Sequence, residues 1–158
     1  MDSYYNTKRF KAVLKSYEDG LKSGNNAFLD SDDLVEIAQF YYSMGRRNDA
    51  VEVIQYALRI FPGAVGPLAL LSRMALFHEN DTEKARRLLS QIEAKQDVEY
   101  SYLKAEIMMA EKDFTGASCY LDECHQSIDK DMLDEVAMDV CGLFLDYDRV
   151  DEAELWLN

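Results

Sequence analysis

The sequence predicts an all-α protein whose short helices run antiparallel in pairs. Apolar residues recur at helical spacing along most of the chain, and no run alternates with the period of two that indicates a strand. Breakers are scarce, because only 2 prolines and 7 glycines occur among 158 residues, of which 48% are apolar. Polar breaks divide the chain into segments of about 11–15 residues joined by short turns, a length typical of single helices.

The first predicted helix is a leader that precedes the rest of the fold. Phe10, Val13, Leu14, Tyr17 and Leu21 follow the spacing of one helix face. The stretch SGNNAFLDSDD, residues 23–33, then breaks the pattern. We therefore expect residues 1–30 to form an N-terminal leader or capping helix followed by a linker.

Two helices are expected next, over residues 33–44 and 46–60. The acids within residues 30–33 supply an N-cap and a negative first turn for the first of them. Gly45 turns the first helix into the second. The second helix ends before Pro62, because the proline ring would clash with a continuing helix.

Five further polar breaks separate the remaining helices, at residues 78–81, 94–97, 111–113, 127–131 and 146–148. In four of these breaks an aspartate precedes the next apolar period, as an N-cap does: Asp81, Asp97, Asp113 and Asp148. The sequence thus predicts at least seven helices and no sheet.

A repeat of about 34 residues runs through these helices. Each copy has a triplet of small or apolar residues at spacings of four and three: Ala50, Ile54 and Ala57; Ala85, Leu89 and Ile92; Ala117, Leu121 and Cys124; and, cut short, Ala153 and Leu157. The helix before each triplet has its own small residue: Ala38, Ser72, Ala105 and Cys141. Small residues let two helix backbones approach closely, so each repeat is expected to be a tightly packed helix pair.

The stretch 34–62 resembles a tetratricopeptide repeat (TPR). That family's motif has large residues, matched by Leu34, Ile37, Tyr41 and Ile54, small ones, matched by Ala38, Ala50 and Ala57, and a late proline, matched by Pro62. The second copy has one extra residue in its turn, and later copies depart from the motif at Ala75, Asp97, Ser101 and Lys104. The resemblance implies a right-handed α-solenoid (superhelix) of antiparallel helix pairs, TPR-like, with repeats at 31–64, 65–97, 98–130 and an incomplete one at 134–158.

The resemblance also implies a concave groove lined by the first helix of each pair. Ten residues are expected to form a partner-binding groove: Gln39, Tyr42, Arg73, Leu76, Phe77, Glu99, Tyr102, Glu106, Met109 and Met138. Such a lining, apolar and aromatic with acids beside it, suits a helix or an extended peptide with apolar anchors. The alternative is that some of these residues cover the leader helix or a missing neighbour.

The expected function is a protein–protein interaction scaffold that binds a peptide or helix of a partner protein. One TPR subgroup clamps C-terminal carboxylates with cations, but the matching positions here are Val35, Gln39, Leu70, Glu99 and Leu103, so this ligand is disfavoured. The alternative is a repeat module of a longer multi-domain regulatory protein that packs against its own chain or self-associates. Self-association is expected through the last helix, which exposes Leu155, Trp156 and Leu157.

The charge of the chain is strongly acidic and unevenly placed. The net charge is −13, and residues 97–158 hold 4 Lys and Arg against 17 Asp and Glu, whereas residues 1–96 are neutral. This field would repel phosphate backbones, so no nucleic-acid partner is expected. It would attract a basic partner, or it serves only to solubilise the surface.

No residue pattern indicates catalysis or metal binding. Cys124 and His125 are adjacent in sequence and cannot face each other on a helix, and with Cys119 they lack zinc-ligand spacing. Residues 146–154 faintly resemble a calcium loop but lack its glycine. We therefore expect no enzyme activity, no catalytic residues, no metal and no cofactor.

The sequence also predicts a cytoplasmic location without a membrane partner. No apolar run approaches the ~18–20 residues that span a bilayer, and the first ten residues contain no apolar core of a signal peptide. The 3 cysteines are an odd number in a domain of ordinary size and do not suggest a disulfide framework.

Overall fold

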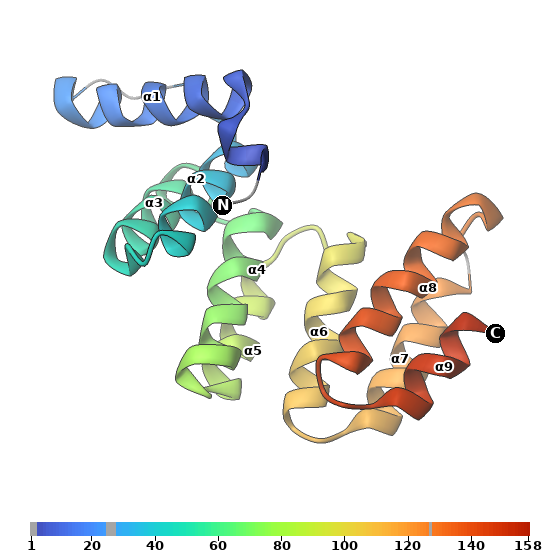
Figure 1. Cartoon of the computed structure of the whole chain (residues 1–158). Helices are drawn as coiled ribbons and strands as arrows, with labels where there is room; N and C mark the ends of the chain where they lie inside the picture. The colour runs from blue at the N-terminus through green and yellow to red at the C-terminus, as the bar shows by residue number, and fades with distance from the viewer. Residues whose placement is uncertain (1–2, 25–27, 127) are drawn as a thin grey trace. The chain divides into compact units, whose positions relative to one another are not determined.

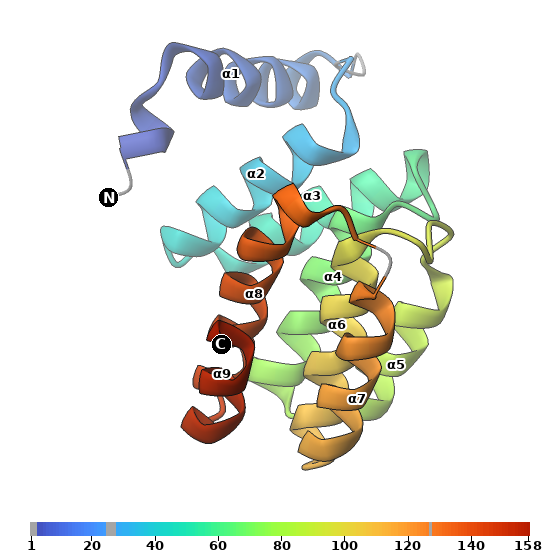
Figure 2. The same cartoon turned by 90° about the vertical axis from the view of Figure 1, so that its right-hand side faces the viewer.

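The computed structural model describes residues 3–24, 28–126 and 128–158, and every regular element among them is helical (Figures 1 and 2). The all-α prediction is therefore confirmed for these residues. Their elements are η1 (Ser3–Asn6), α1 (Lys8–Ser23), α2 (Ser31–Ser43), α3 (Arg47–Ile60), α4 (Val65–Met74), η2 (Ala75–Glu79), α5 (Thr82–Gln91), α6 (Val98–Ala110), α7 (Phe114–His125), α8 (Lys130–Leu145) and α9 (Val150–Leu157). In this described part, no helix combines the length and the apolar character that a bilayer crossing requires.

The chain divides into two compact units, Met1–Leu70 and Leu71–Asn158. The division falls inside α4, and so within the second predicted repeat at 65–97. Inside the units, successive helices pack mostly in pairs, α2 with α3, α6 with α7 and α8 with α9. These pairs agree with the predicted pairing, whereas the right-handed superhelix stays a prediction.

Helix boundaries in the first unit lie close to the predicted ones. Helix α2 begins at Ser31 rather than at 33, and α3 begins at Arg47 rather than at 46. The Asp30 side chain accepts a hydrogen bond of 2.8 Å from the Asp33 N–H, and the Asp30 N–H donates in return to the Asp33 carboxylate. Gly45 turns the chain with a φ of 75°, which a residue with a side chain adopts only at a cost.

Small residues lie where α2 and α3 cross, as the repeat predicts. Ala38, Ala50 and Ala57 have exposed fractions of 0%, 2% and 0%. The start of α4 approaches α2 equally closely, because a Cβ atom on Gly66 would lie 3.1 Å from Val35 Cγ2. Small side chains thus set the spacing between helices in this unit.

The leader helix α1 contacts α2 through aromatic rings. The Phe10 ring lies 5.0 Å from the ring of Tyr5 and 5.2 Å from that of Phe40. Phe10 and Tyr17 of the predicted leader face are buried, but Leu21 is 62% exposed. The predicted face is therefore buried in its earlier turns and not at its end.

Aspartates start three helices of the second unit, as predicted. Asp81, Asp97 and Asp113 each accept a hydrogen bond from a backbone N–H in the first turn of α5, α6 and α7. The prediction for Asp148 is wrong, because α9 has Arg149 at its N-cap and no side-chain capping bond. Asp148 instead completes the preceding turn with a φ of 57°. The predicted breaks at 23–33 and 127–131 include residues 25–27 and 127, which lie outside the described residues.

A π-helical turn, η2, continues α4 directly. The turn of a π-helix is wider than that of an α-helix and accommodates one inserted residue. The extra residue predicted in the turn of the second repeat stays a prediction. Ala75 and Leu76 within η2 are buried, with exposed fractions of 0% and 6%, whereas Phe77 is 51% exposed. Ala75, a departure from the TPR motif, is therefore a core residue.

The core of the second unit lies among α6, α7, α8 and α9. Ala105, Ala117 and Ala153 are all at least 99% buried, and the largest fully buried side chain of this core is that of Phe144. In the preceding helix pair, α4 and α5, Ser72 is the small residue of the first helix. Its hydroxyl donates a hydrogen bond to the Ala85 carbonyl oxygen at 3.0 Å. This hydrogen bond lets a polar side chain occupy a fully buried position.

Candidate partner-binding site

The ten predicted groove residues are divided between the two units and differ in burial. On α2, Gln39 is exposed and Tyr42 is half-buried. In the second unit, Phe77 and Met138 are exposed, Arg73 and Glu99 are half-buried, and four side chains are buried: Leu76, Tyr102, Glu106 and Met109. These four buried side chains therefore do not line an open groove. That any of the ten residues contacts a partner stays a prediction.

Helix α8 covers the face of α6 that was expected to be open. The Tyr102 hydroxyl donates to Asp139 Oδ2 on α8 at 3.1 Å. Tyr102 and Met109 also belong to the same apolar cluster as Val136 and Val140 of α8. Burial, assisted by the hydrogen bond with Asp139, raises the pKa of Tyr102 above its ordinary value, so its hydroxyl remains a donor. These α6 side chains are thus used for packing inside the second unit.

An ion cluster joins Arg73 of α4 to two carboxylates of α6. The guanidinium donates from Nε and Nη2 to Glu106, with an Nη2–Oε2 distance of 2.7 Å, and from Nη1 to Glu99. The exposed fraction of the side chain is 28% for Arg73, 36% for Glu99 and 6% for Glu106. The charge of Glu106 is therefore matched inside the unit rather than offered to solvent.

Burial and pairing oppose each other in this cluster. Burial disfavours the Arg73 cation, but the hydrogen bonds and charges of Glu106 and Glu99 outweigh it, so the pKa of Arg73 lies above its ordinary value. Burial raises the pKa of the Glu106 carboxyl, although Arg73 acts in the opposite direction. The charged state of Glu106 at neutral pH therefore depends on the guanidinium beside it.

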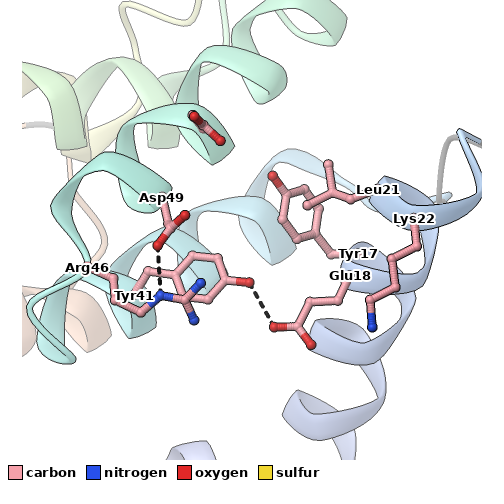
Figure 3. A pocket seen from close by; sticks show the side chains of 8 residues that line it. Tyr17, Glu18, Leu21, Lys22, Tyr41, Arg46 and Asp49 are labelled. Carbon is pink, nitrogen blue, oxygen red and sulfur yellow. Dashed lines mark hydrogen bonds and ion pairs between the residues drawn. The ribbon is translucent and has the colours of Figure 1, made fainter.

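A pocket of about 350 Å³ opens between α1, α2 and α3 of the first unit (Figure 3). Its lining is Tyr17, Glu18, Leu21, Lys22, Tyr41, Arg46, Asp49 and Glu52. The Tyr41 hydroxyl points at Glu18 and donates to its Oε1 at 2.9 Å. The Arg46 guanidinium lies 4.4 Å from the centre of the Tyr41 ring and donates to Asp49. None of the ten predicted groove residues lines this pocket.

The polar groups of this pocket are largely engaged with one another. Burial, followed by the hydrogen bond with Glu18, raises the pKa of Tyr41 above its ordinary value. Burial, followed by the charge of Glu52, does the same for Tyr17. Among the lining residues there is no cysteine, serine or histidine to act as nucleophile or base. The arrangement suits a joint that ties α1 to the α2–α3 pair.

A larger cavity, of about 500 Å³, lies in the second unit between α8, α9 and the last residue of α7. We call it the α8–α9 cavity, and these two helices lie side by side in Figure 1. Its lining is His125, Leu133, Asp134, Val136, Ala137, Met138, Trp156, Leu157 and Asn158. Met138 and Leu157 are 65% and 55% exposed, so apolar side chains of the cavity face the solvent.

His125 contributes a buried imidazole to this cavity. Its ring lies 5.8 Å from the Trp156 ring, edge-on, and 6.1 Å from the Tyr102 ring. Among the described residues, neither buried ring nitrogen has a hydrogen-bond partner of good geometry, although the Leu121 carbonyl lies close enough to act on the imidazole. Burial lowers the pKa of His125 more than this carbonyl and the Asp122 charge raise it. Leaving such a group without a well-formed hydrogen bond costs about 1–3 kcal/mol.

The sequence pattern indicated part of this cavity. Trp156 and Leu157 were expected to be exposed and to self-associate, and Met138 was a predicted groove residue. Leu133 and Asp134 were missed, because acids flank both of them and suggest a solvated stretch. His125 was noted only beside Cys124, since nothing in its local pattern indicates the neighbouring α9.

Other reactive groups are scattered through the described structure. Cys119 is exposed, Cys124 is half-buried and Cys141 is buried, and all three are free thiols. In the part of the chain that the structure describes, no three His, Cys, Asp or Glu side chains gather as metal ligands do. The cavities are therefore the features of these residues that suggest binding.

Comparison with known proteins adds no relative. No protein-family model matches the chain, and no curated protein is significantly similar to it. The resemblance to tetratricopeptide repeats rests on the residues at the motif positions and on the repeat spacing, and it stays a prediction. The described residues form an all-α fold in which helices pack mostly in pairs.

Proposed function

We propose that the chain is a TPR-like helical-repeat protein that binds a segment of a partner protein and performs no catalysis itself. The observation that carries this proposal is the burial of small residues in all four predicted pairs. They are Ala38, Ala50 and Ala57; Ser72 and Ala85; Ala105 and Ala117; and Cys141 and Ala153, none more than 7% exposed. Cys124, the last member of the third triplet, is half-buried. Such repetition supports a chain of similar helix pairs, an architecture that presents extended surfaces to partners.

The surface of the second unit supports a basic partner with apolar anchors. Met138, Leu155 and Leu157 are exposed by 65%, 73% and 55%, respectively. The unit from residue 71 to 158 carries 21 Asp and Glu against 9 Lys and Arg. Exposed apolar side chains within an acidic surface favour a segment that has apolar residues and positive charge.

Three predicted groove residues are exposed, Gln39 on α2 and Phe77 and Met138 in the second unit. Tyr42 is half-buried, with the Arg47 guanidinium 5.6 Å from its ring centre. Arg73 and Glu99 are half-buried and paired with each other. Because the acidic, apolar surface belongs to the second unit, Phe77 and Met138 are the predicted groove residues that the binding proposal retains.

Selection from a displayed library of peptides about 16 residues long, roughly four helical turns, tests the proposal. We expect recovered sequences with positive charge and apolar residues that bind the full chain saturably. A dissociation constant near ~1 μM, about −8 kcal/mol, is the strength typical of such a module.

The control is an unrelated acidic protein of similar net charge, taken through the same selection. Recovery of the same peptides from that protein would mean that charge alone attracts them. That result, or the recovery of no binding peptide from the chain, would contradict the proposed function.

A further inference from the structure

The α8–α9 cavity has features that specify an occupant. We propose that it receives the apolar face of a basic amphipathic helix from a partner protein. This inference rests on the proposed function and names the partner's chemistry and its place on the second unit. It assigns a binding role to Leu133, Met138 and Trp156, of which only Met138 was a predicted groove residue.

The size and lining of the cavity suit a row of apolar side chains. Its volume of about 500 Å³ lies inside the ~300–1,000 Å³ range of ordinary ligand pockets. Leu133, Met138 and Leu157 are exposed by 39%, 65% and 55%, so they gain burial when the cavity is filled. A helix offers apolar anchors at i, i+3, i+4 and i+7, which project in one row and can cover these exposed apolar side chains together.

Charge selects the partner and disfavours a second copy of the chain. Residues 129–158, which include α8 and α9, carry 10 Asp and Glu against 2 Lys and Arg. Asp134 belongs to the lining itself. An approaching helix with lysine or arginine beside its anchors is attracted, whereas another α8–α9 surface, equally acidic, is repelled.

His125 forms part of the cavity wall. The residue is 6% exposed, and its ring lies edge-on to the Trp156 ring at 5.8 Å. Both ring nitrogens are buried from solvent, so the imidazole contributes to the packed wall behind Trp156 and offers no polar contact to the partner helix.

Trp156 makes the inference directly measurable, because it is the only tryptophan in the chain and lines the cavity. The probe is a synthetic helix of about 16 residues with leucines at i, i+3, i+4 and i+7 and lysines elsewhere. A control peptide has the same composition with the leucines spread around the helix. We expect the Trp156 emission to change saturably with the amphipathic peptide, which should bind at least about tenfold tighter than the control.

A matched pair of variants locates the contact. Met138 lines the cavity and Met132 does not, although both lie on α8 and are exposed, by 65% and 53%. Met138→Asp should weaken binding by about tenfold or more, and Met132→Asp by less than about twofold. Both positions are at the surface, so the variants should fold, which circular dichroism verifies.

Several results would overturn the inference. Equal binding of the two peptides, or equal effects of the two substitutions, would mean attraction by charge alone. A labelled peptide that binds without changing the Trp156 emission would place the contact elsewhere and leave the proposed function intact. A dimer that forms at high concentration and is abolished by Met138→Asp would identify a second copy as the occupant. No binding of this peptide, together with a failed display selection, would remove both proposals.

Discussion

Two arginine clusters of similar composition occur, one in each unit, and they differ in their exposure to solvent. In the first unit, Arg9 of α1 contacts Asp33 and Glu36 of α2 at 2.9 and 3.0 Å. In the second, Arg73 of α4 contacts Glu99 and Glu106 of α6. The exposed fraction is 59% for the Arg9 side chain and 28% for that of Arg73, and the most buried acid of each cluster is 14% exposed (Asp33) and 6% exposed (Glu106).

This difference decides what each cluster contributes. An exposed ion pair gains little, since water and salt screen the charges and the long side chains lose freedom. A buried pair need not stabilise either, but removal of one partner leaves an uncompensated charge in the interior. The ion-pair distances therefore do not tell which cluster matters more for stability, whereas the burial of the side chains does.

The largest predicted effect comes from breaking the buried cluster on one side. Arg73→Met should lower the free energy of unfolding by about 3–5 kcal/mol, because Glu106 remains buried without its cation. Arg9→Met, the matched change in the first unit, should leave the unfolding curve nearly unchanged. Urea denaturation followed by circular dichroism measures both variants under the same conditions.

A second substitution distinguishes charge from lost packing. In Arg73→Met/Glu106→Leu no buried charge remains, so most of the lost stability should return. If the double variant is as unstable as Arg73→Met alone, the guanidinium acts through its packing and the comparison of the two clusters fails.

The apolar helix crossings should, in contrast, respond alike in both units. Ala57 and Ala117 are fully buried, each within the second helix of its repeat. Ala57→Leu and Ala117→Leu should each cost about 1–3 kcal/mol, since a branched side chain is forced between two close helices. Melting temperatures measure the loss, and an unchanged value in either variant would show that its crossing is looser than described.

The helices were predictable because their signals are local. Asp30, Asp81 and Gly45 act within one turn of the backbone that they cap or bend. Even so, Asp148 was misassigned, since an aspartate before an apolar period marks either an N-cap or the turn before it. Helix type and approximate ends thus follow from short stretches of sequence.

The covered face of α6 was not predictable, because it depends on distant elements. Apolar residues occur on every side of α6, among them Leu103, Met108 and Met109, so periodicity indicates no outward face. The burial of Glu106 depends on Arg73, 33 residues earlier in the chain. The α8–α9 cavity likewise requires His125 and Trp156 to meet, and no local pattern states that they do.

The buried imidazole of His125 in the second unit predicts a pH dependence of stability, smaller than the effects of the substitutions above. The pKa of His125 lies below its ordinary value because of burial, so the unfolded chain binds a proton that the folded chain resists. The stability of the wild type should therefore fall as the pH drops below about 6.5, the ordinary histidine pKa. His125→Leu lacks this loss, and its stability relative to the wild type should rise toward acid pH.

Denaturation of the two proteins side by side, from pH 8 to pH 5 or roughly the histidine range, isolates this effect. The titration of Glu106 is common to both proteins and cancels in the difference. A difference in unfolding free energy that is constant with pH would show that the imidazole is solvated rather than buried.

The smallest effect concerns the exposed cluster of the first unit. At about 1 M salt the screening length shrinks to ~3 Å, comparable with the ion-pair distances themselves. Any residual difference between Arg9→Met and the wild type at low salt should therefore disappear. Thermal melts at low and high salt provide the measurement, and a difference that persists would mean that Arg9 acts through contacts other than charge.

Hydrogen–deuterium exchange of the full chain, with and without a display-selected peptide, tests the central claim most directly. The claim is that the chain binds a partner segment through the acidic, apolar surface of its second unit. At saturating peptide, we expect slower exchange of backbone amides in α8 and α9 and unchanged exchange in α2 and α3. Protection confined to α1, α2 and α3, or no protection anywhere at saturation, would contradict the account.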